Sequence, residues 1–375
     1  MLSGWRDRTL PDLLDAHGLG LATERPFPTD GWSGATFSTL EADGRRYVLK
    51  RTSPAIDWIA EATDDRDLRE AWLAAAFSGD PTGRDSGRFA AMPSMAYLGA
   101  ARDGDGDGAA ILLPDLSTEL IAWERAGHDP AIDAATLGRV LRGIVRLHAA
   151  PWSRILDADA AGAGVTVPWT PLVPRLTLLT RPSAARYEAS GNPVGARFLA
   201  GWDAFDRTAP AGARDLIERL SADPEPLVAA LGRLPAFGLH GDLKLANVAL
   251  IGDDAITCID WQMSLRAPAA VELGWFLVSN SGSLPSPPEA VMAAYRDALA
   301  HAGRRGDGSE ANDPAGLAGD WSAQEDLTWI VGLLLRGWRK GLDAEAGVSL
   351  ASGVSAVEDL GWWAAHAVDA AGRRL

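Results

Sequence analysis

The chain has 375 residues, of which 47% are hydrophobic and 23% are charged. This composition excludes a disordered or fibrous protein and predicts a globular chain with two lobes or domains. The formal net charge of -15 argues against nucleic acid as the main partner, because an acidic surface is repelled by the phosphate backbone. The sequence contains no apolar stretch of the roughly 18 residues needed for a membrane-spanning helix, so we expect no membrane partner.

The first residues and the cysteine content predict a cytoplasmic protein. The opening MLSGWRDRTLPDLL carries charges where a signal peptide needs an apolar run. The single cysteine, Cys258, excludes an internal disulfide and fits a reducing compartment. The sequence does not distinguish a monomer from a homodimer.

The first third of the chain alternates short strands with turns. Residues 35–42 and 46–52 have strand character and flank the hairpin signal ADGRR. Residues 67–77 have helical spacing, and two further strands are predicted at 94–100 and 109–114. These segments predict a small sheet accompanied by a helix.

After residue 116 the pattern changes to long helices, interrupted by one polar stretch. Helical spacing is found at 132–149, 195–208, 212–220, 286–301, 321–341 and 355–371. The predicted fold class is therefore α+β, with a small antiparallel-sheet lobe first and a larger, mostly helical lobe after it.

The polar stretch HGDLKLAN contains His240, Asp242 and Asn247 in the order H-x-D-x-x-x-x-N, and Asp260 ends the following β-like run, ITCID. Each residue alone is common in turns or cores, but that explanation does not account for the ordered set. Phosphoryl transfer needs Mg²⁺ held by oxygen ligands, together with a separate carboxylate that takes the acceptor's proton. Asp242 fits the second role, and Asn247 with Asp260 fits the first.

HGDLKLAN followed by IDW resembles the motifs of the aminoglycoside phosphotransferase and choline kinase family, the small-molecule relatives of protein kinases. The resemblance spans roughly residues 28–340. It implies a bilobal protein-kinase-like fold with a nucleotide-binding lobe at 1–113, a hinge at 114–118 and a helical lobe at 119–375. The helical lobe would carry the catalytic loop at 238–262 and the acceptor site.

The resemblance implies a nucleotide site in the small lobe. Lys50, at the end of RYVLK, would bind the nucleotide phosphates, with a glutamate from the next helix as its partner. We prefer Glu70 over Glu61 because Glu70 lies within the helical pattern. The turn before the second strand, with Ser33 and Gly34, would cover the phosphates.

The resemblance also implies backbone contacts to adenine in the hinge segment ILLPDLS. The carbonyl of Pro114 would accept from the adenine amino group, and the N–H of Leu116 would donate. His148 would be a structural histidine beneath the catalytic loop. Glu272 stands where the family has an aspartate that braces this loop.

Lys244 would neutralise the transferring phosphoryl group, although an exposed loop lysine is the open alternative. The expected activity is transfer of the γ-phosphoryl group of ATP, with GTP not excluded, to a hydroxyl of a small molecule. An amino sugar, aminoglycoside, amino alcohol or similar metabolite would serve as acceptor. Acidic residues of the last helices could bind its amines: Glu325, Asp326, Glu358 and Asp359. The alternative is a catalytically silent kinase fold that binds nucleotide or a partner.

Overall fold

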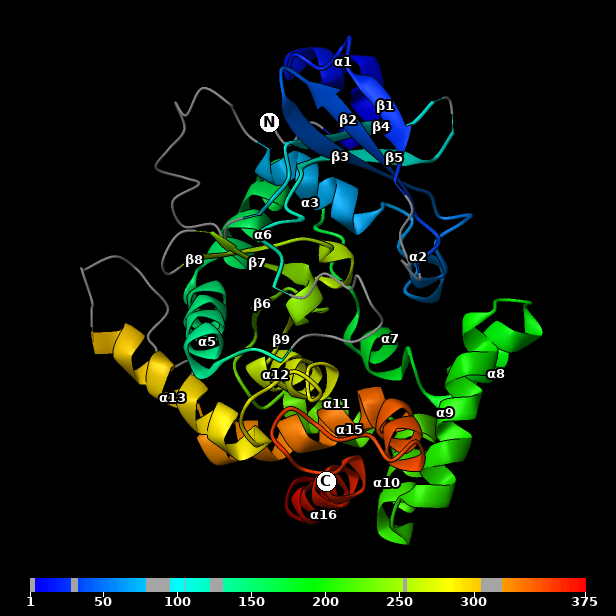
Figure 1. The fold of residues 1–375 in the computed structure, drawn as a ribbon, viewed down its shortest axis with the longest axis vertical. Coiled ribbons are helices and arrows are strands. Elements are labelled where there is room, and N and C mark those ends of the chain that lie inside the picture. Colours follow the sequence, from blue (N-terminus) through cyan, green and yellow to red (C-terminus); the bar gives the residue numbers. More distant parts are fainter. Residues whose placement is uncertain are drawn as a thin grey trace.

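The structure is a computed structural model that describes residues 4–27, 33–78, 95–104, 106–121, 131–251, 255–304 and 319–375. A small sheet with short helices forms one end of the molecule, and a larger assembly of helices forms the other (Figure 1). The first third of the chain builds the small part, and the chain ends in the large one.

The small part contains one antiparallel sheet with the strand order β1-β2-β3-β5-β4. Its strands are β1 (Thr23–Pro26), β2 (Thr36–Ala42), β3 (Arg45–Thr52), β4 (Gly99–Arg102) and β5 (Ala109–Pro114). Asp43 and Gly44 join β2 to β3 with φ values of 50° and 73°. Two successive positive φ values suit a two-residue hairpin, so the hairpin predicted from ADGRR is confirmed.

Short helices accompany this sheet. They are η1 (Trp5–Asp7), α1 (Leu10–Ala16), α2 (Trp58–Ala62) and α3 (Arg69–Phe77). On β5, Leu112 belongs to the small core beside α1, whereas Ile111 belongs to the main core with α3. On β3, Leu49 lies in the core beside α1, so Lys50 points to the opposite face because strand side chains alternate.

The large part is mostly helical. Its helices are α5 (Ala134–Ala149), α6 (Trp152–Gly162), α7 (Leu172–Thr177), α8 (Arg181–Ala189), α9 (Val194–Thr208), α10 (Ala211–Ala222), α11 (Glu225–Leu231), α12 (Ala269–Ser279), α13 (Pro288–Arg304), α15 (Trp321–Glu345) and α16 (Ala356–Arg374). α15 packs against α9, α12 and α16. α16 lies at the end of the molecule farthest from the small sheet (Figure 1).

Two small antiparallel sheets lie between these parts. β6 (Phe237–Leu239) pairs with β9 (Leu265–Ala267), and β7 (Val248–Ile251) pairs with β8 (Ala255–Cys258). The 3-10 helices η2 (Leu245–Asn247) and η3 (Trp261–Met263) lie in the connections. The loop from β6 to β7 thus carries the HGDLKLAN motif, and the link from β8 to β9 carries Asp260. Cys258 is buried, and burial raises the pKa of its thiol.

The predicted α+β fold, with a small antiparallel sheet and a larger helical lobe, is confirmed. The hydrophobic pattern located the long helices but missed α6, α7, α8 and α11. It also missed β1, α1 and α2 in the small part. The division at residues 114–118 stays a prediction. In the part of the chain that the structure describes, no helix is long and apolar enough to cross a membrane.

Candidate active site

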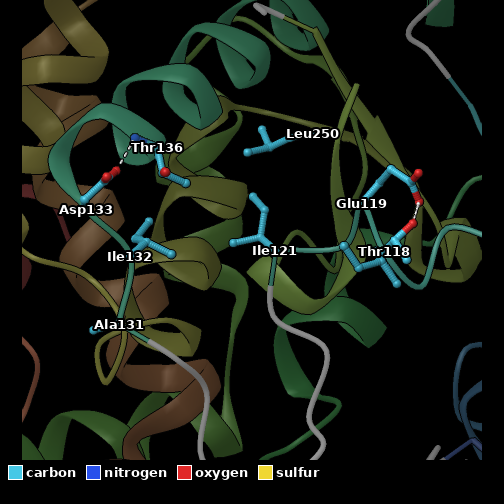
Figure 2. Close-up of a pocket in the computed structure, with 9 residues that line it drawn as sticks. Thr118, Glu119, Ile121, Ala131, Ile132, Asp133, Thr136 and Leu250 are labelled. Atoms are coloured by element: carbon cyan, nitrogen blue, oxygen red, sulfur yellow. Dashed lines mark hydrogen bonds between the residues drawn. The ribbon is translucent and has the colours of Figure 1, made fainter. Parts of the chain in front are cut away.

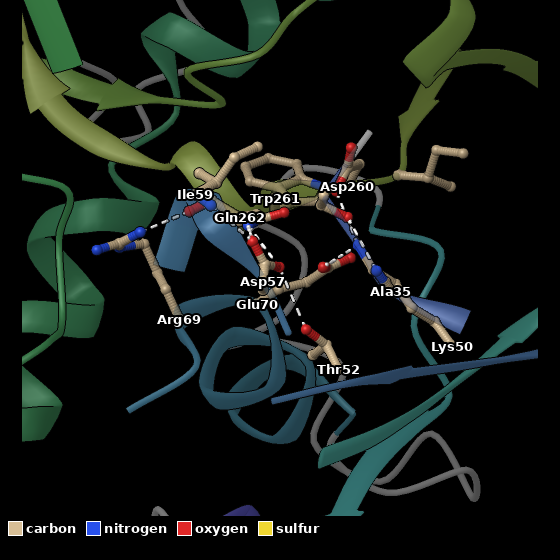
Figure 3. Close-up of polar contacts among 12 residues, drawn as sticks. Ala35, Lys50, Thr52, Asp57, Ile59, Arg69, Glu70, Asp260, Trp261 and Gln262 are labelled. Carbon is tan, nitrogen blue, oxygen red and sulfur yellow. Dashed lines mark hydrogen bonds and ion pairs between the residues drawn. The ribbon is translucent and has the colours of Figure 1, made fainter. Parts of the chain in front are cut away.

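The first cluster of the site joins the small sheet to the link after β8. Lys50 Nζ lies 2.5 Å from Glu70 Oε2 and 2.9 Å from Asp260 Oδ1. The Lys50 and Glu70 side chains are each 5% exposed, whereas that of Asp260 is 33% exposed, so a ligand reaches this cluster from the Asp260 side. Figure 3 shows the three side chains converging. Glu70 is therefore the ion-pair partner of Lys50, and Glu61 lies exposed on α2.

Charge pairing fixes the ionisation of this cluster. Burial would lower the pKa of Lys50, but the carboxylates of Asp260 and Glu70 outweigh it and raise the pKa. Burial would likewise raise the pKa of Asp260, but the ammonium groups of Lys50 and Lys244 lower it to about 2. Lys50 is therefore a cation and Asp260 an anion at neutral pH.

Tyr97 holds Glu70 in place. Its hydroxyl donates to Glu70 Oε1 at 2.6 Å and accepts from the Trp261 N–H at 3.1 Å. Trp261 directly follows Asp260, so Tyr97 connects both carboxylates that face Lys50. Tyr97 lies in the predicted strand 94–100, and no sequence pattern indicates its role.

Buried polar contacts also fasten α2 and α3 to the link after Asp260. The amide of Gln262 donates to both oxygens of Asp57 at 2.8 Å, and Asp57 caps α2 through the Ile59 and Ala60 N–H groups. Arg69 donates to the Gln262 carbonyl at 2.6 Å (Figure 3). These bonds set the position of Glu70 on α3 relative to Asp260.

The catalytic-loop motif begins with a histidine that has an architectural role. The Asp242 N–H donates to His240 Nδ1 at 3.2 Å, so Nε2 carries the proton and donates to the Ile259 carbonyl at 2.9 Å. His240 is fully buried. It ties the start of the loop to the residue before Asp260.

Gly241 occupies a position that no other residue fits well. Its φ is +85°, and a Cβ there would lie 1.9 Å from the Met263 carbonyl oxygen. Its N–H donates to Glu272 Oε1 at 2.6 Å, and its carbonyl accepts from Arg175 Nε and Nη2 at 3.0 and 2.7 Å.

The predicted contact of Glu272 with the loop is present. Glu272 Oε2 also lies 2.8 Å from His148 Nε2, and His148 Nδ1 lies 2.8 Å from the Tyr295 hydroxyl. His148 is thus a structural histidine, as expected. Arg175, which no sequence pattern singled out, binds the carbonyl of the same glycine.

Asp242 lies at the centre of the loop. Its Oδ2 accepts from Lys244 Nζ and from the Asn247 amide, both at 3.1 Å, and the same amide donates to the Asp242 carbonyl at 2.9 Å. Oδ1 accepts from no donor among the described residues. Asp242 therefore keeps one oxygen available for an acceptor.

The donor set around Asn247 and Asp260 fits Mg²⁺. The Asn247 amide nitrogen is bonded, which leaves its oxygen without a donor among the described residues, and only Oδ1 of Asp260 contacts Lys50. The Ile259 N–H donates to the Asn247 carbonyl at 3.1 Å and holds the two segments together. No group of three or more His, Cys, Asp or Glu side chains is arranged for a metal within the described ranges. Mg²⁺ needs fewer protein ligands, because it retains waters and binds phosphate oxygens.

The predicted phosphate-covering turn is described only in part. Gly31 lies outside the described residues, whereas Ser33 and Gly34 lie just before β2. Gly34 has a φ of +91°, and a Cβ there would lie 2.2 Å from the Ile56 carbonyl. The turn therefore requires glycine at this position.

The hinge backbone has the orientation that adenine recognition needs. Tyr47 pairs with Pro114, and the Asp115 N–H donates to the Arg46 carbonyl at 3.2 Å. Successive residues of a strand turn their polar groups to opposite sides, so the Pro114 carbonyl is directed away from β3. The same alternation predicts that the Leu116 N–H also points away from β3.

Three of the four acidic residues expected to bind amines have other partners, and Glu325 forms no ion pair with a described residue. Asp326 pairs with Arg373 and Arg374, and Asp359 pairs with Lys340. Glu358 forms a capping box with Ser355 at the start of α16. Asp326 and Asp359 thus join α15 to α16, and Glu358 stabilises the start of α16.

Figure 2 shows a pocket between residues 118–121 and the start of α5, with Leu250 in its lining. Asp133 lies at its edge and caps α5 by accepting from the Thr136 N–H at 2.7 Å. No residue of the predicted site lines this pocket. It is separate from the centre formed by Asp242 and Asp260.

Comparison with known proteins identifies the family. Among curated proteins none matches the sequence. A similar solved structure is the macrolide 2'-phosphotransferase MphH from Brachybacterium faecium, with 17% identity, coverage of 97% of this chain and 96% of that chain, and a TM-score of 0.42. Choline kinase LicA from Streptococcus pneumoniae has 11% identity, coverage of 96% and 97%, and a TM-score of 0.43. Similarities this low support no statement about the substrate.

The family assignment comes from the sequence. The model of the phosphotransferase enzyme family matches residues 24–308, which is well over half of the chain. The matched region includes Lys50, Asp242, Asn247 and Asp260. The chain therefore belongs to the phosphotransferase enzyme family and is a kinase that acts on small molecules.

Proposed function

We propose that the protein transfers the γ-phosphoryl group of ATP, with Mg²⁺, to a hydroxyl group of a small molecule. GTP is not excluded as the donor. The observation that carries the proposal is the convergence of Lys50, Asp242, Asn247 and Asp260 from three distant segments of the chain. A structural role alone gives no reason for a cation, two carboxylates and an amide to lie together and leave oxygens that accept from no donor among the described residues.

In the proposed reaction, Asp242 Oδ1 accepts the proton of the acceptor hydroxyl. The hydroxyl oxygen of the acceptor forms a bond to the γ-phosphorus at the same time. The bond from that phosphorus to the bridging β,γ-oxygen breaks, and ADP leaves with the electron pair. Asn247 and Asp260 would hold Mg²⁺, which neutralises charge on the phosphate oxygens. Lys244 and Lys50 add positive charge on either side of the transferred group.

The remaining residues would position the nucleotide. Lys50, held by Glu70, would contact its phosphates, and the turn with Ser33 and Gly34 would cover them. The Pro114 carbonyl and the Leu116 N–H would bind the adenine edge. In this arrangement Asp242 acts on the acceptor and has no contact with adenine, so the two binding steps can be separated by mutation.

The test measures ADP release with Mg-ATP across amino sugars, aminoglycosides, amino alcohols, polyols and hydroxy acids. Asp242→Asn should reduce kcat by about 10³-fold or more while nucleotide affinity, measured by calorimetry, stays within a few-fold. Asp203 on α9 forms an exposed ion pair with Arg181, so Asp203→Asn removes the same charge away from the proposed site and should leave kcat unchanged. Full activity of Asp242→Asn would refute the assignment, and so would the absence of acceptor-dependent turnover with every class.

A further inference from the structure

The acceptor side of the proposed site contains a guanidinium group that has no anionic partner among the described residues. Arg336 lies in α15, where its Nε is buried and forms no hydrogen bond. In the described part of the chain, no carboxylate forms a salt bridge with it. The adjacent acid, Asp343, is paired with Arg339 at 3.0 Å. A charge in a site with little water is costly unless an opposite charge joins it.

Trp275 of α12 connects Arg336 to the catalytic loop. The guanidinium carbon of Arg336 lies 5.2 Å from the centre of the Trp275 ring, and that of Arg175 lies 4.6 Å from it. Arg175 donates two hydrogen bonds to the Gly241 carbonyl, next to Asp242. Nε and Nη2 of Arg175 are thus bonded to the backbone, whereas Arg336 donates no hydrogen bond to any residue that the structure describes.

The charges of Arg336 and the catalytic loop also influence each other. Burial lowers the pKa of Arg336 to about 10, and the carboxylate of Asp242 acts in the opposite direction. The charge of Arg336 in turn opposes protonation of Lys244, whose pKa is raised on balance by Asp242 and Asp260 despite burial. Together with the link through Trp275 and Arg175, these charge interactions place Arg336 near Lys244 and Asp242.

The carboxylates that could bind a cationic acceptor are not available there. Asp326 and Asp359 are paired with Arg373 and Lys340, respectively, within the C-terminal helices. Glu325 lies eleven residues before Arg336 on α15, which corresponds to about 16 Å along the helix. The charge beside Asp242 on the acceptor side is therefore positive.

We propose, on the basis of the phosphotransferase function above, that Arg336 binds an anionic group of the acceptor. The substrate class is then a hydroxylated small molecule with a carboxylate or a phosphate monoester, in place of an amino sugar or amino alcohol. A planar guanidinium matches both oxyanions with two parallel hydrogen bonds. Stacking on Trp275 holds Arg336 in position before the ligand arrives.

The first test compares acceptors that share a carbon skeleton and differ in charge. One series is gluconate, glucose 6-phosphate, glucose and glucosamine, and another is glycerate, glycerol 3-phosphate, glycerol and 2-amino-1,3-propanediol. The acidic members should give kcat/KM values at least tenfold above the neutral and amino members. Preference for a neutral or amino member overturns the inference and leaves the proposed function intact.

The second test measures binding and does not depend on turnover. Inorganic phosphate and succinate are titrated by calorimetry into protein saturated with Mg²⁺ and AMP-PNP, so that the γ-phosphate position is occupied. Arg336→Gln should raise the Kd of the bound anion at least tenfold, and the preference between the two probes distinguishes phosphate from carboxylate. No binding to the wild type, or equal affinity in Arg336→Gln, overturns the inference.

Two further variants control this test. Arg207→Gln removes the same charge from an exposed ion pair with Glu345 and should leave the Kd unchanged. Arg336→Lys keeps the positive charge and loses the two-pronged geometry, so it should weaken anion binding a few-fold even if Arg336→Gln folds poorly. Wild-type affinity in Arg336→Lys would contradict two-pronged recognition.

Discussion

The nucleotide side and the acceptor side of the proposed site neutralise their cations in different ways. On the nucleotide side, Lys50 is enclosed by Glu70 and Asp260 and is 5% exposed. On the acceptor side, Arg336 stacks on Trp275 and has no carboxylate partner among the described residues. The nucleotide side is therefore organised by the protein's own charges, whereas the acceptor side depends on the charge of its ligand.

The largest expected effect comes from breaking the nucleotide side. Lys50→Met leaves two carboxylates facing each other, and loss of one partner of a buried ion pair costs about 3–5 kcal/mol of unfolding free energy. Adding Glu70→Gln should restore part of this stability but not the activity, because the phosphate-binding ammonium stays absent. Urea denaturation and ADP release measure the two effects.

Comparing Lys50→Met with the double variant tests whether charge pairing stabilises the nucleotide side. If Lys50→Met alone is as stable as the wild type, the three charges are not coupled, and the contrast between the two sides is lost. Arg51→Met is the neighbouring control, because Arg51 pairs with Glu24 on the partly exposed side of the sheet. It should change stability by about 1 kcal/mol or less.

Lys244 lies between the two sides, so its removal sharpens the comparison. Its Nζ is 3.1 Å from Asp242 Oδ2, and its side chain is 37% exposed. Lys244→Ala should lower kcat about tenfold with little change in the KM for ATP, because its charge is needed mainly as the phosphoryl group moves. An unchanged kcat would assign Lys244 to the solvated loop surface.

The smallest expected effect concerns Glu272, which accepts a hydrogen bond from the Gly241 N–H in the catalytic loop. Burial would raise the pKa of Glu272, but its hydrogen bond and charge interaction with His148 and the Gly241 N–H lower it. Because its pKa is lowered in the folded state, this carboxylate stabilises the fold at pH values above 4.5, the ordinary pKa of a glutamate. This stabilisation is lost as the pH falls through the lowered value.

Glu272→Gln should therefore be less stable than the wild type at pH 7 by about 1–2 kcal/mol. The difference should shrink as the pH falls below about 4.5. Denaturation at several pH values measures it. Glu218→Gln, exposed on α10, is the matched control. A difference that stays constant with pH would mean that the charge of Glu272 does not stabilise the loop.

The sequence predicted the parts of the site whose residues lie close together in the chain. The order of His240, Asp242 and Asn247 located the loop, and the strand RYVLK located Lys50. Glu70 could be preferred over Glu61 because the helical pattern contained it. Each of these inferences used residues that lie close together in the chain or form a known motif.

Contacts between distant segments could not be predicted in this way. Asp326 appeared free to bind an amine, because its partners, Arg373 and Arg374, lie at the far end of the next helix. Tyr97 meets Glu70 across a segment that carries no sequence signal. Arg336 is the single charge in the apolar run IVGLLLRGW. The sequence does not show that this arginine lacks a carboxylate partner among the described residues, which is the basis of its proposed role.

The buried Cys258 has a practical consequence. It is the single cysteine of the chain, and its thiol is shielded and held neutral. Cysteines introduced at exposed Arg45 on β3 and exposed Glu218 on α10 would then be the sites at which a thiol-reactive spin label attaches. The dipolar coupling between two such labels would report whether the two lobes approach each other when nucleotide and acceptor bind.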